Sequence, residues 1–426
     1  MPLFFFVTLF LVSLVFSQNY EKLSLQNCID IAKKNSLSLK STKLNEKTAE
    51  SSLNQARNAR LPDLSGRVSQ GVSGNPLVDD YKTRYGLNMS LNSSMPVFTA
   101  GRIGHSVNQA EFRKDIAELS SEEAARNLSE QVIRAYMQVW SLMESEASAG
   151  DAFVLSKKML AKDSVLFEAG SFTASDLAMA FAQMASDSLG LLQMQSNLVQ
   201  SYTALRQLLE IPQGAAFSLL PPDSVMAEAT ESYESLLAQA EKNSYSKKID
   251  SLSVLAASEA VNIANTARYP SASLSASLGT GLNWEVSNPR YPTQLKNGLG
   301  YSASIGLSIP IIDWGKATDG VLQAQVAQEK AEISALNTQK QLENMIEQLA
   351  LQTETYRLQW DVSSIQVNAQ RLALEKSVQQ HELGLMDISS LIQQQTIFNN
   401  SQVRHNQAKY SYLLSKSLLE LQTGLR

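Results

Sequence analysis

The chain contains the same sequence pattern twice. The segment AKKNSLSLKSTKLNEKTAESSLNQARNARLPDLS at 32–65 matches AEKNSYSKKIDSLSVLAASEAVNIANTARYPSAS at 240–273. Three further pairs follow in the same order: SMPVFTAGR (94–102) with SIPIIDWGK (308–316), LFEAGSFTASDL (166–177) with QHELGLMDISSL (380–391), and LRQLLEI (205–211) with SKSLLEL (415–421). Matches that keep their order along the whole chain indicate two copies of one unit of about 200 residues.

Each copy is expected to run through the same order of helices and strands. The helices that open the copies end at ARLP (59–62) and ARYP (267–270), because proline and the residue before it leave the helical conformation. The expected elements of repeat 1 (18–211) are a helix at 23–60, strands at 63–74 and 84–97, a long helix at 103–167, a tip turn at 168–175 and a helix at 176–211. Those of repeat 2 (233–426) are a helix at 233–268, strands at 271–284 and 299–311, a long helix at 317–382, a tip turn at 383–388 and a helix at 389–421, with an inter-repeat linker at 212–232.

The helix lengths predict a closed hairpin in each copy. A run of about 65 residues spans roughly 100 Å at 1.5 Å per residue, and two shorter helices laid end to end match it. Apolar residues recur every three to four positions along the long runs, as at Val132, Tyr136 and Val139. This spacing is typical of helices that pack side by side as coiled coils, with the strands at one end and the glycine turn at the other.

The strands have two different faces. In SASLSASLGTGLNW (271–284), apolar residues alternate with Ser, Gly and Asn, which is the period of a strand. A face of small uncharged residues fits a water-filled barrel interior, and the apolar face then meets lipid. The expected lipid-facing residues are Leu87, Met89, Leu91, Leu274, Leu278, Leu282, Ile305, Leu307 and Ile309. The expected lumen-facing residues are Asn88, Ser90, Asn92, Ser273, Ser275, Ser277, Ser302 and Ser304.

Four strands cannot close a membrane barrel. An open sheet edge is not tolerated in lipid, and known single-chain barrels begin at eight strands. We therefore expect several copies of the chain to contribute strands to one barrel. The strands alone do not determine whether two, three or more copies take part.

The N-terminus is expected to be an export signal. MPLFFFVTLFLVSLVFS (1–17) is apolar and uncharged, and Val15 and Ser17 occupy positions −3 and −1 of a signal-peptide cleavage before Gln18. The alternative is a retained anchor, since no Lys or Arg precedes the apolar run. Cys28 allows a lipidation hypothesis, but it lacks the small residue that precedes a lipid-acceptor cysteine, so we expect a buried, inert thiol.

The residue inventory argues against an enzyme or a nucleic-acid-binding protein. The formal net charge of −5 gives no indication of a basic surface that would bind nucleic acid. The three histidines, His105, His381 and His405, lack metal-ligand spacing, and a single cysteine cannot build a metal cluster. We therefore expect no catalytic residues, no metal and no cofactor.

The order of these motifs resembles the outer membrane efflux protein family, the TolC-like channels. The likeness lies in LSLQNCIDIAKKNSLSLKS, ARLPDLSG, SMPVFTAGR and LFEAGSFTASDL with their repeated counterparts, and it covers about 22–424. It implies a mainly α-helical fold with a transmembrane β-barrel: a homotrimer with a twelve-stranded barrel in the outer membrane and a long α-helical barrel in the periplasm. It also implies a periplasmic adaptor protein at the lower tip and an inner-membrane pump of the RND or ABC type.

The resemblance assigns roles to the two tip turns. The family pattern of a glycine, five residues, an aspartate and an aliphatic residue fits Gly170, Asp176 and Leu177. Gly384 and Leu391 fit it in repeat 2, and these five residues are the expected adaptor contacts. Ser390 and Gln393 stand where the family places aspartates, so the resemblance does not imply an acidic gate at these two positions. Two readings of Asp387 stay open, an acidic gate ring or a solvent-exposed helix cap. His381 would make the gate pH-sensitive, although an ordinary exposed histidine is the expectation.

Three functions are weighed on this basis. The first is the passive exit duct of a tripartite efflux or type I secretion system. The second is a soluble periplasmic coiled-coil adaptor or scaffold, which the absence of charge on the Leu274–Leu282 face disfavours. The third, a passive sugar porin, leaves the long helices without a role. The transported substrate is left open among drugs, metal ions and proteins.

Overall fold

The computed structural model describes residues 20–74, 84–215, 217–222, 232–285 and 298–424. The expected signal peptide at 1–17 lies outside these residues, as does much of the linker at 212–232. The chain forms two compact units, each of which takes segments from both sequence repeats. We call them the sheet unit (residues 40–123 and 244–341) and the helical unit (residues up to 39, 124–243 and 342 onward).

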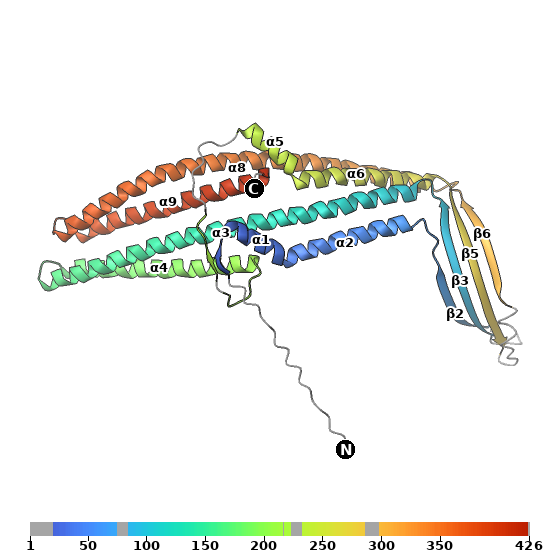
Figure 1. Cartoon of the computed structure of the whole chain (residues 1–426), viewed down its shortest axis with the longest axis horizontal. Helices are drawn as coiled ribbons and strands as arrows, with labels where there is room; N and C mark the ends of the chain where they lie inside the picture. Colours follow the sequence, from blue (N-terminus) through green and yellow to red (C-terminus); the bar gives the residue numbers. More distant parts are fainter. Residues whose placement is uncertain (1–19, 75–83, 216, 223–231, 286–297, 425–426) are drawn as a thin grey trace, which may run out of the picture. The chain divides into compact units, whose positions relative to one another are not determined.

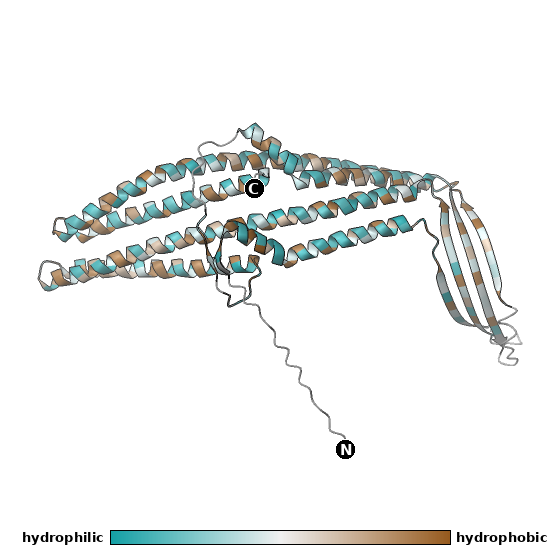
Figure 2. Cartoon of the chain, in the orientation of Figure 1, coloured by the Kyte–Doolittle hydropathy of each residue, from teal (hydrophilic) through white to brown (hydrophobic). Residues whose placement is uncertain are grey.

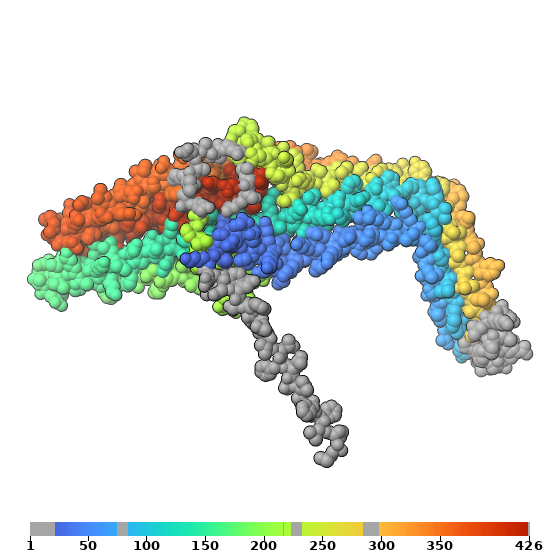
Figure 3. Space-filling model, in the orientation of Figure 1, coloured from blue at the N-terminus to red at the C-terminus, as the bar shows by residue number. Residues whose placement is uncertain are grey.

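The sheet unit is built on four antiparallel strands. β2 (Ser65–Ser73) pairs with β3 (Arg84–Phe98), β3 with β5 (Ser271–Glu285), and β5 with β6 (Gly300–Ser308), so the two copies meet at the β3–β5 ladder. The strands lie side by side in this order in the cartoon and in the space-filling view (Figures 1 and 3). The unit also contains most of α2 (Leu37–Asn58), all of α6 (Tyr245–Asn265), the short 3₁₀ turn η1 (Thr266–Arg268), and the first parts of the long helices α3 (Arg102–Glu168) and α8 (Lys316–Glu382).

The corner between strand and long helix has the same backbone in both copies. Ala100 and Gly101 have φ of +48° and +87°, and Trp314 and Gly315 have φ of +55° and +86°. Two successive left-handed residues reverse the chain sharply, and only glycine adopts that conformation without steric cost. The corner explains why the duplicated motifs FTAGR and IDWGK both carry glycine at the same place.

The helical unit contains two long hairpins. α3 is followed by α4 (Ala174–Leu208), and α8 by α9 (Ile388–Thr423). The turns of both hairpins lie at the same end of the unit (Figure 1). The core packs around three fully buried side chains, Tyr136, Ile133 and Leu205, with α1 (Leu25–Asn35) and α9 against them. α5 (Tyr233–Asn243) packs against α9.

The helices expected at 23–60 and 233–268 are each broken at one serine. Ser36 separates α1 from α2, and Ser244 separates α5 from α6. The hydroxyl of Ser36 accepts a bond from the amide of Leu39, and that of Ser244 accepts one from Lys247. A serine that caps the next helix satisfies a backbone amide without a helical partner, so the break is locally stable.

Part of the expected linker forms a small sheet in the helical unit. β4 (Phe217–Leu219) pairs in parallel with β1 (Tyr20–Leu23). The hydroxyl of buried Tyr136 donates to the carbonyl oxygen of Leu220 and lies 3.3 Å from that of Leu23. The core thus holds the end of this two-stranded sheet at which both strands finish, and sequence periodicity did not indicate the sheet.

Cys28 lies in this core and is fully buried. Burial raises the pKa of its thiol to about 12. The expected burial of this thiol is confirmed. Among the described helices, none carries an apolar stretch of the length that a membrane crossing requires.

Candidate functional site: the sheet faces and the tip turns

The strand register gathers the apolar side chains on one face of the sheet. Directly opposite residues share a face, and Leu87 pairs with Leu282, Leu91 with Leu278, and Leu274 with both Met95 and Ile305. Val68 of β2 joins the same face opposite Met89. Most of these side chains are exposed, with Ile305 at 75% and Leu307 at 63%. Hydropathy alternates along the strands in Figure 2. This exposed apolar face needs an apolar environment.

The opposite face is made mainly of small polar residues. Asn92 pairs with Ser277 and Ser277 with Ser302, whose hydroxyl oxygens lie 2.8 Å apart. Ser90 pairs with Gly279 and Asn88 with Gly281. A Cβ built at Gly281 would lie 2.7 Å from Oδ1 of Asn88, so glycine makes room for the asparagine side chain. Every residue expected to line the lumen lies on this face.

Several positions differ from the expected pattern of the sheet. Ile309 lies beyond β6, which ends at Ser308 because Pro310 cannot donate to the ladder. Leu282 is on the apolar face but is only 8% exposed, so it contributes little surface there. Arg67 of β2 lies on the polar face opposite Ser90, where only small side chains were expected.

Both tip turns reverse the chain through the same glycine conformation. Gly170 and Gly384 have φ of +76° and +73°. The amide of Ser171 donates to Leu166 O at 2.9 Å, and that of Leu385 to Gln380 O at 2.8 Å. These bonds close the last turn of α3 and of α8 in the same way, so glycine is required at both positions.

The helix caps that follow the two glycines place the hydroxyl residue and the aspartate in opposite positions. In the first turn Thr173 is the N-cap of α4, and its hydroxyl accepts from the amide of Asp176 while Asp176 accepts from the amide of Thr173. In the second turn Asp387 is the N-cap of α9 and accepts from the amide and hydroxyl of Ser390. The carboxylate has moved from the third helical position to the cap itself, which accounts for the serine at position 390.

The Asp387 carboxylate is held in its charged form. Hydrogen bonds from the Ser389 hydroxyl and from the amide and hydroxyl of Ser390 keep the pKa of Asp387 well below its usual range. The structure places Asp387 at an exposed helix start, and Gln393 is exposed one turn and a half further along α9.

Two of the expected tip residues lie in the interior. Leu391 is fully buried, in a cluster with Ala180, Leu374 and Ile388, so it cannot contact an adaptor directly. His381 is only 2% exposed, and the expectation of an exposed histidine is wrong. Its Nε2 lies 3.1 Å from Oδ1 of Asp163 on α3. The periodicity of α8 did not reveal this because the partner is more than two hundred residues away.

The exposed surface of the tip contains two leucines that were not among the expected adaptor contacts. Leu383 and Leu385 flank Gly384 and are 74% and 76% exposed. Gly170, Ser171 and Gly384 are also exposed. We call these five residues the tip surface. The signal for the leucines was present in the segment ELGLMD, since two leucines around a turn glycine have no neighbouring helix to cover them.

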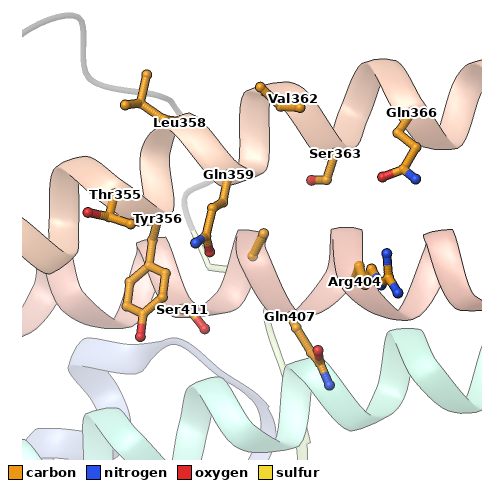
Figure 4. A pocket seen from close by; sticks show the side chains of 11 residues that line it. Thr355, Tyr356, Leu358, Gln359, Val362, Ser363, Gln366, Arg404, Gln407 and Ser411 are labelled. Atoms are coloured by element: carbon orange, nitrogen blue, oxygen red, sulfur yellow. The ribbon is translucent and has the colours of Figure 1, made fainter.

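A groove runs along α8 and α9 in the helical unit. It has a volume of about 640 Å³ and is lined by Gln359, Ser363, Arg404, Gln407 and neighbouring residues. Figure 4 shows Tyr356 and Gln359 directed toward α9, while Leu358 and Val362, which also line the groove, point away from α9. The outer side of α8 therefore presents apolar side chains that no helix of the described unit covers.

The sequence matches the family described as outer membrane efflux protein over residues 28–210 and 236–425. No curated protein matches the chain in sequence.

Solved structures share its fold at low identity. The outer membrane channel CmeC of Campylobacter jejuni is similar over 94% of this chain and 85% of its own, with a TM-score of 0.82 and 20% identity. The outer membrane protein VceC of Vibrio cholerae is similar over 94% and 96%, with a TM-score of 0.74 and 19% identity. The MtrE outer membrane channel of Neisseria gonorrhoeae, in its open state, is similar over 94% and 88%, with a TM-score of 0.71 and 19% identity.

Proposed function

Because this chain belongs to the outer membrane efflux protein family, we propose that it is a homotrimeric exit duct that conducts substrates passively from an inner-membrane pump to the outside. A twelve-stranded barrel formed by three copies spans the outer membrane. The α-helical part extends into the periplasm, and a periplasmic adaptor docks on the tip surface. The pump, of the RND or ABC type, supplies the energy.

The sheet supports this proposal most directly. Its apolar face carries large exposed side chains and its other face carries Ser, Gly and Asn, which is the arrangement of a strand between lipid and water. β2 and β6 are its two edges. Two different edges pair head to tail, and such heterologous contacts close into a ring. Closure therefore requires further copies of the same chain.

The helical unit presents a second pair of unlike surfaces. α8 exposes Leu351, Leu358, Val362, Ile365 and Leu372 at spacings of seven, four, three and seven. α4 exposes Leu189, Leu192 and Val199 at spacings of three and seven. These are the spacings of a coiled-coil seam. One stripe on each hairpin gives each copy a place for one neighbour on either side, as a ring of helices requires.

The alternatives fit less well. A soluble periplasmic adaptor would not expose a lipid-compatible sheet face, and adaptors do not belong to this family. An enzyme is disfavoured because the family is one of channels. Among the described residues, no group of three or more His, Cys, Asp or Glu is placed to hold a metal ion.

Two measurements test the proposal. Membrane fractionation is expected to place the protein in the outer membrane and to release it only with detergent. Purified protein in planar bilayers is expected to conduct, and a closed resting state of the tip would show as rare, large openings. Full recovery in a detergent-free periplasmic extract, or bilayers that never conduct, would contradict the proposal.

A further inference from the structure

We propose that His381 is a positioning residue that ties the two tip turns together through one extra proton, and that the tip surface loosens when this proton is lost. The proposal rests on the proposed function, because the role of the tip surface in adaptor docking is part of that function. The proton itself follows from local geometry alone.

His381 contacts three segments at once. Its Nδ1 lies 2.9 Å from the carbonyl oxygen of Met386 in the second tip turn, and its Nε2 lies 3.1 Å from Oδ1 of Asp163 on α3. The ring also meets Phe172 of the first tip turn edge to face, with centroids 5.7 Å apart. One imidazole therefore bridges both turns and the long helix of the other hairpin.

Both hydrogen-bond partners of the ring are acceptors. A carbonyl oxygen only accepts, so Nδ1 must carry a proton to bond Met386. The contact between Nε2 and Oδ1 of Asp163 then needs a second proton, on the ring or on the carboxyl. A neutral imidazole facing a carboxylate holds only one of these two protons. The geometry thus requires one proton more than a neutral imidazole and a carboxylate hold together.

Burial makes the extra proton important. Asp163 is fully buried and its Oδ2 has no hydrogen-bond partner among the described residues. A buried carboxylate with one oxygen unpaired is costly unless a cation or a shared proton compensates for its charge. Loss of the proton would set the Nε2 lone pair against the carboxylate oxygen in a dry site. The two groups would then separate, and the α8–α9 turn would part from α3.

The other charged groups nearby do not replace this proton. Lys162 of α3 lies 3.7 Å from a carboxylate oxygen of Glu382 on α8 and 3.4 Å from its carbonyl oxygen, in an exposed pair beside the buried one. Asp176 and Asp387 serve as caps of α4 and α9. The remaining charged residues on the last three turns of α3 and α8 are Lys157, Lys158, Glu168, Arg371, Glu375 and Lys376. None of these remaining residues is paired with Asp163.

The test is hydrogen exchange of the full mature protein in detergent, read by mass spectrometry. Peptides from both tip turns are compared at about pH 6 and about pH 8.5, which lie on either side of the ordinary histidine pKa of about 6.5. The measured exchange rates are corrected for the pH dependence of the chemical exchange rate. Wild-type protection at the turns is expected to be about tenfold lower at the higher pH, because the closed turns bind one proton more than the opened turns and their closure weakens as that proton is lost. His381→Gln keeps a donor toward Asp163 but does not titrate, so its protection is expected to be equal at the two pH values.

His405→Gln is the matched control. His405 lies on α9, partly buried, with Nδ1 3.2 Å from the Ser363 hydroxyl. This variant is expected to keep the wild-type pH response. Asp163→Asn is the second test variant, and it is expected to remove the response even if His381→Gln folds poorly.

A pH response that persists in both test variants, or a wild-type protein without one, overturns the proposal. Because exchange at the turns does not depend on conduction, bilayers that never conduct would refute the duct and leave this result standing.

Discussion

The side-chain amide of Asn243 donates to the carbonyl oxygen of Thr423 at 2.6 Å, in the last turn of α9. Asn35 makes the equivalent bond in the other repeat, to the carbonyl oxygen of Leu209 at 3.3 Å, where α4 ends. Carbonyl groups in the last turn of a helix lack helical partners. Each repeat therefore closes its own hairpin with one asparagine just before the serine break.

Asn243→Ala is expected to lower the free energy of unfolding by about 1–3 kcal/mol, because the Thr423 carbonyl loses its donor in a largely buried place. Thermal unfolding in detergent measures the change. Asn54→Ala, at an exposed position of α2, is the control and should change stability little. Equal melting temperatures for the two variants would show that the bond does not contribute to stability.

Gly170→Val should strain the first tip turn, since a left-handed backbone costs about 1–2 kcal/mol for a residue with a side chain. No atom lies within 4 Å of a Cβ at this position, so the effect comes from the backbone alone. We expect intact trimers with weaker capture of the adaptor in a pull-down. Gly320→Val, in open space within a helix, is the control. Undiminished capture by the Gly170 variant would argue against adaptor docking at this turn.

Leu278→Arg places a charge on the apolar face of the sheet and should cost about 2–4 kcal/mol if this face meets the middle of the bilayer. Ser277→Arg places the same charge on the polar face one residue earlier. Assembled protein in outer-membrane fractions is expected to fall for the first variant and to persist for the second. If the Ser277 variant were lost and the Leu278 variant persisted, the polar face and not the apolar face would be the one that meets lipid.

Val362→Glu should disrupt association between copies, because it places a charge in the exposed apolar stripe of α8. Val362 is 64% exposed in the single chain, so the chain itself should fold normally. Light scattering after size-exclusion chromatography measures the oligomer, and circular dichroism checks the helices. Gln193→Glu on α4 is an exposed control that lies outside the stripes. Trimers unaffected by Val362→Glu would remove α8 from the interface.

Asp387→Ser should leave the pH response of the tip unchanged. The lowered pKa of Asp387 means that its contribution to stability is present above the ordinary aspartate range and is lost only as the pH falls below it. Between about pH 6 and pH 8.5 the carboxylate stays charged, so its replacement shifts exchange protection equally at both values. A response that disappears in this variant would assign the pH dependence to the cap instead of His381.

The sequence by itself determined the features that repeat locally. Alternation along the strands predicted which of their residues share a face, because the side-chain period of a strand is two whatever lies beyond it. The pairs Leu91 with Leu278 and Asn92 with Ser277 show the same sorting in three dimensions. The tip glycines were likewise identifiable, since a helix that reverses needs a left-handed residue.

Only the tertiary structure decided which distant groups meet. Asp163 and His381 lie on long helices whose sequence pattern does not specify which residues near the tip are buried. Neither their contact nor their burial could therefore be predicted. The same holds for Leu391 and for the bond from Asn243 to Thr423. Periodicity assigns a residue to a face, but the partner across that face depends on how separate helices align, and this register is set by packing over the whole length of the hairpins.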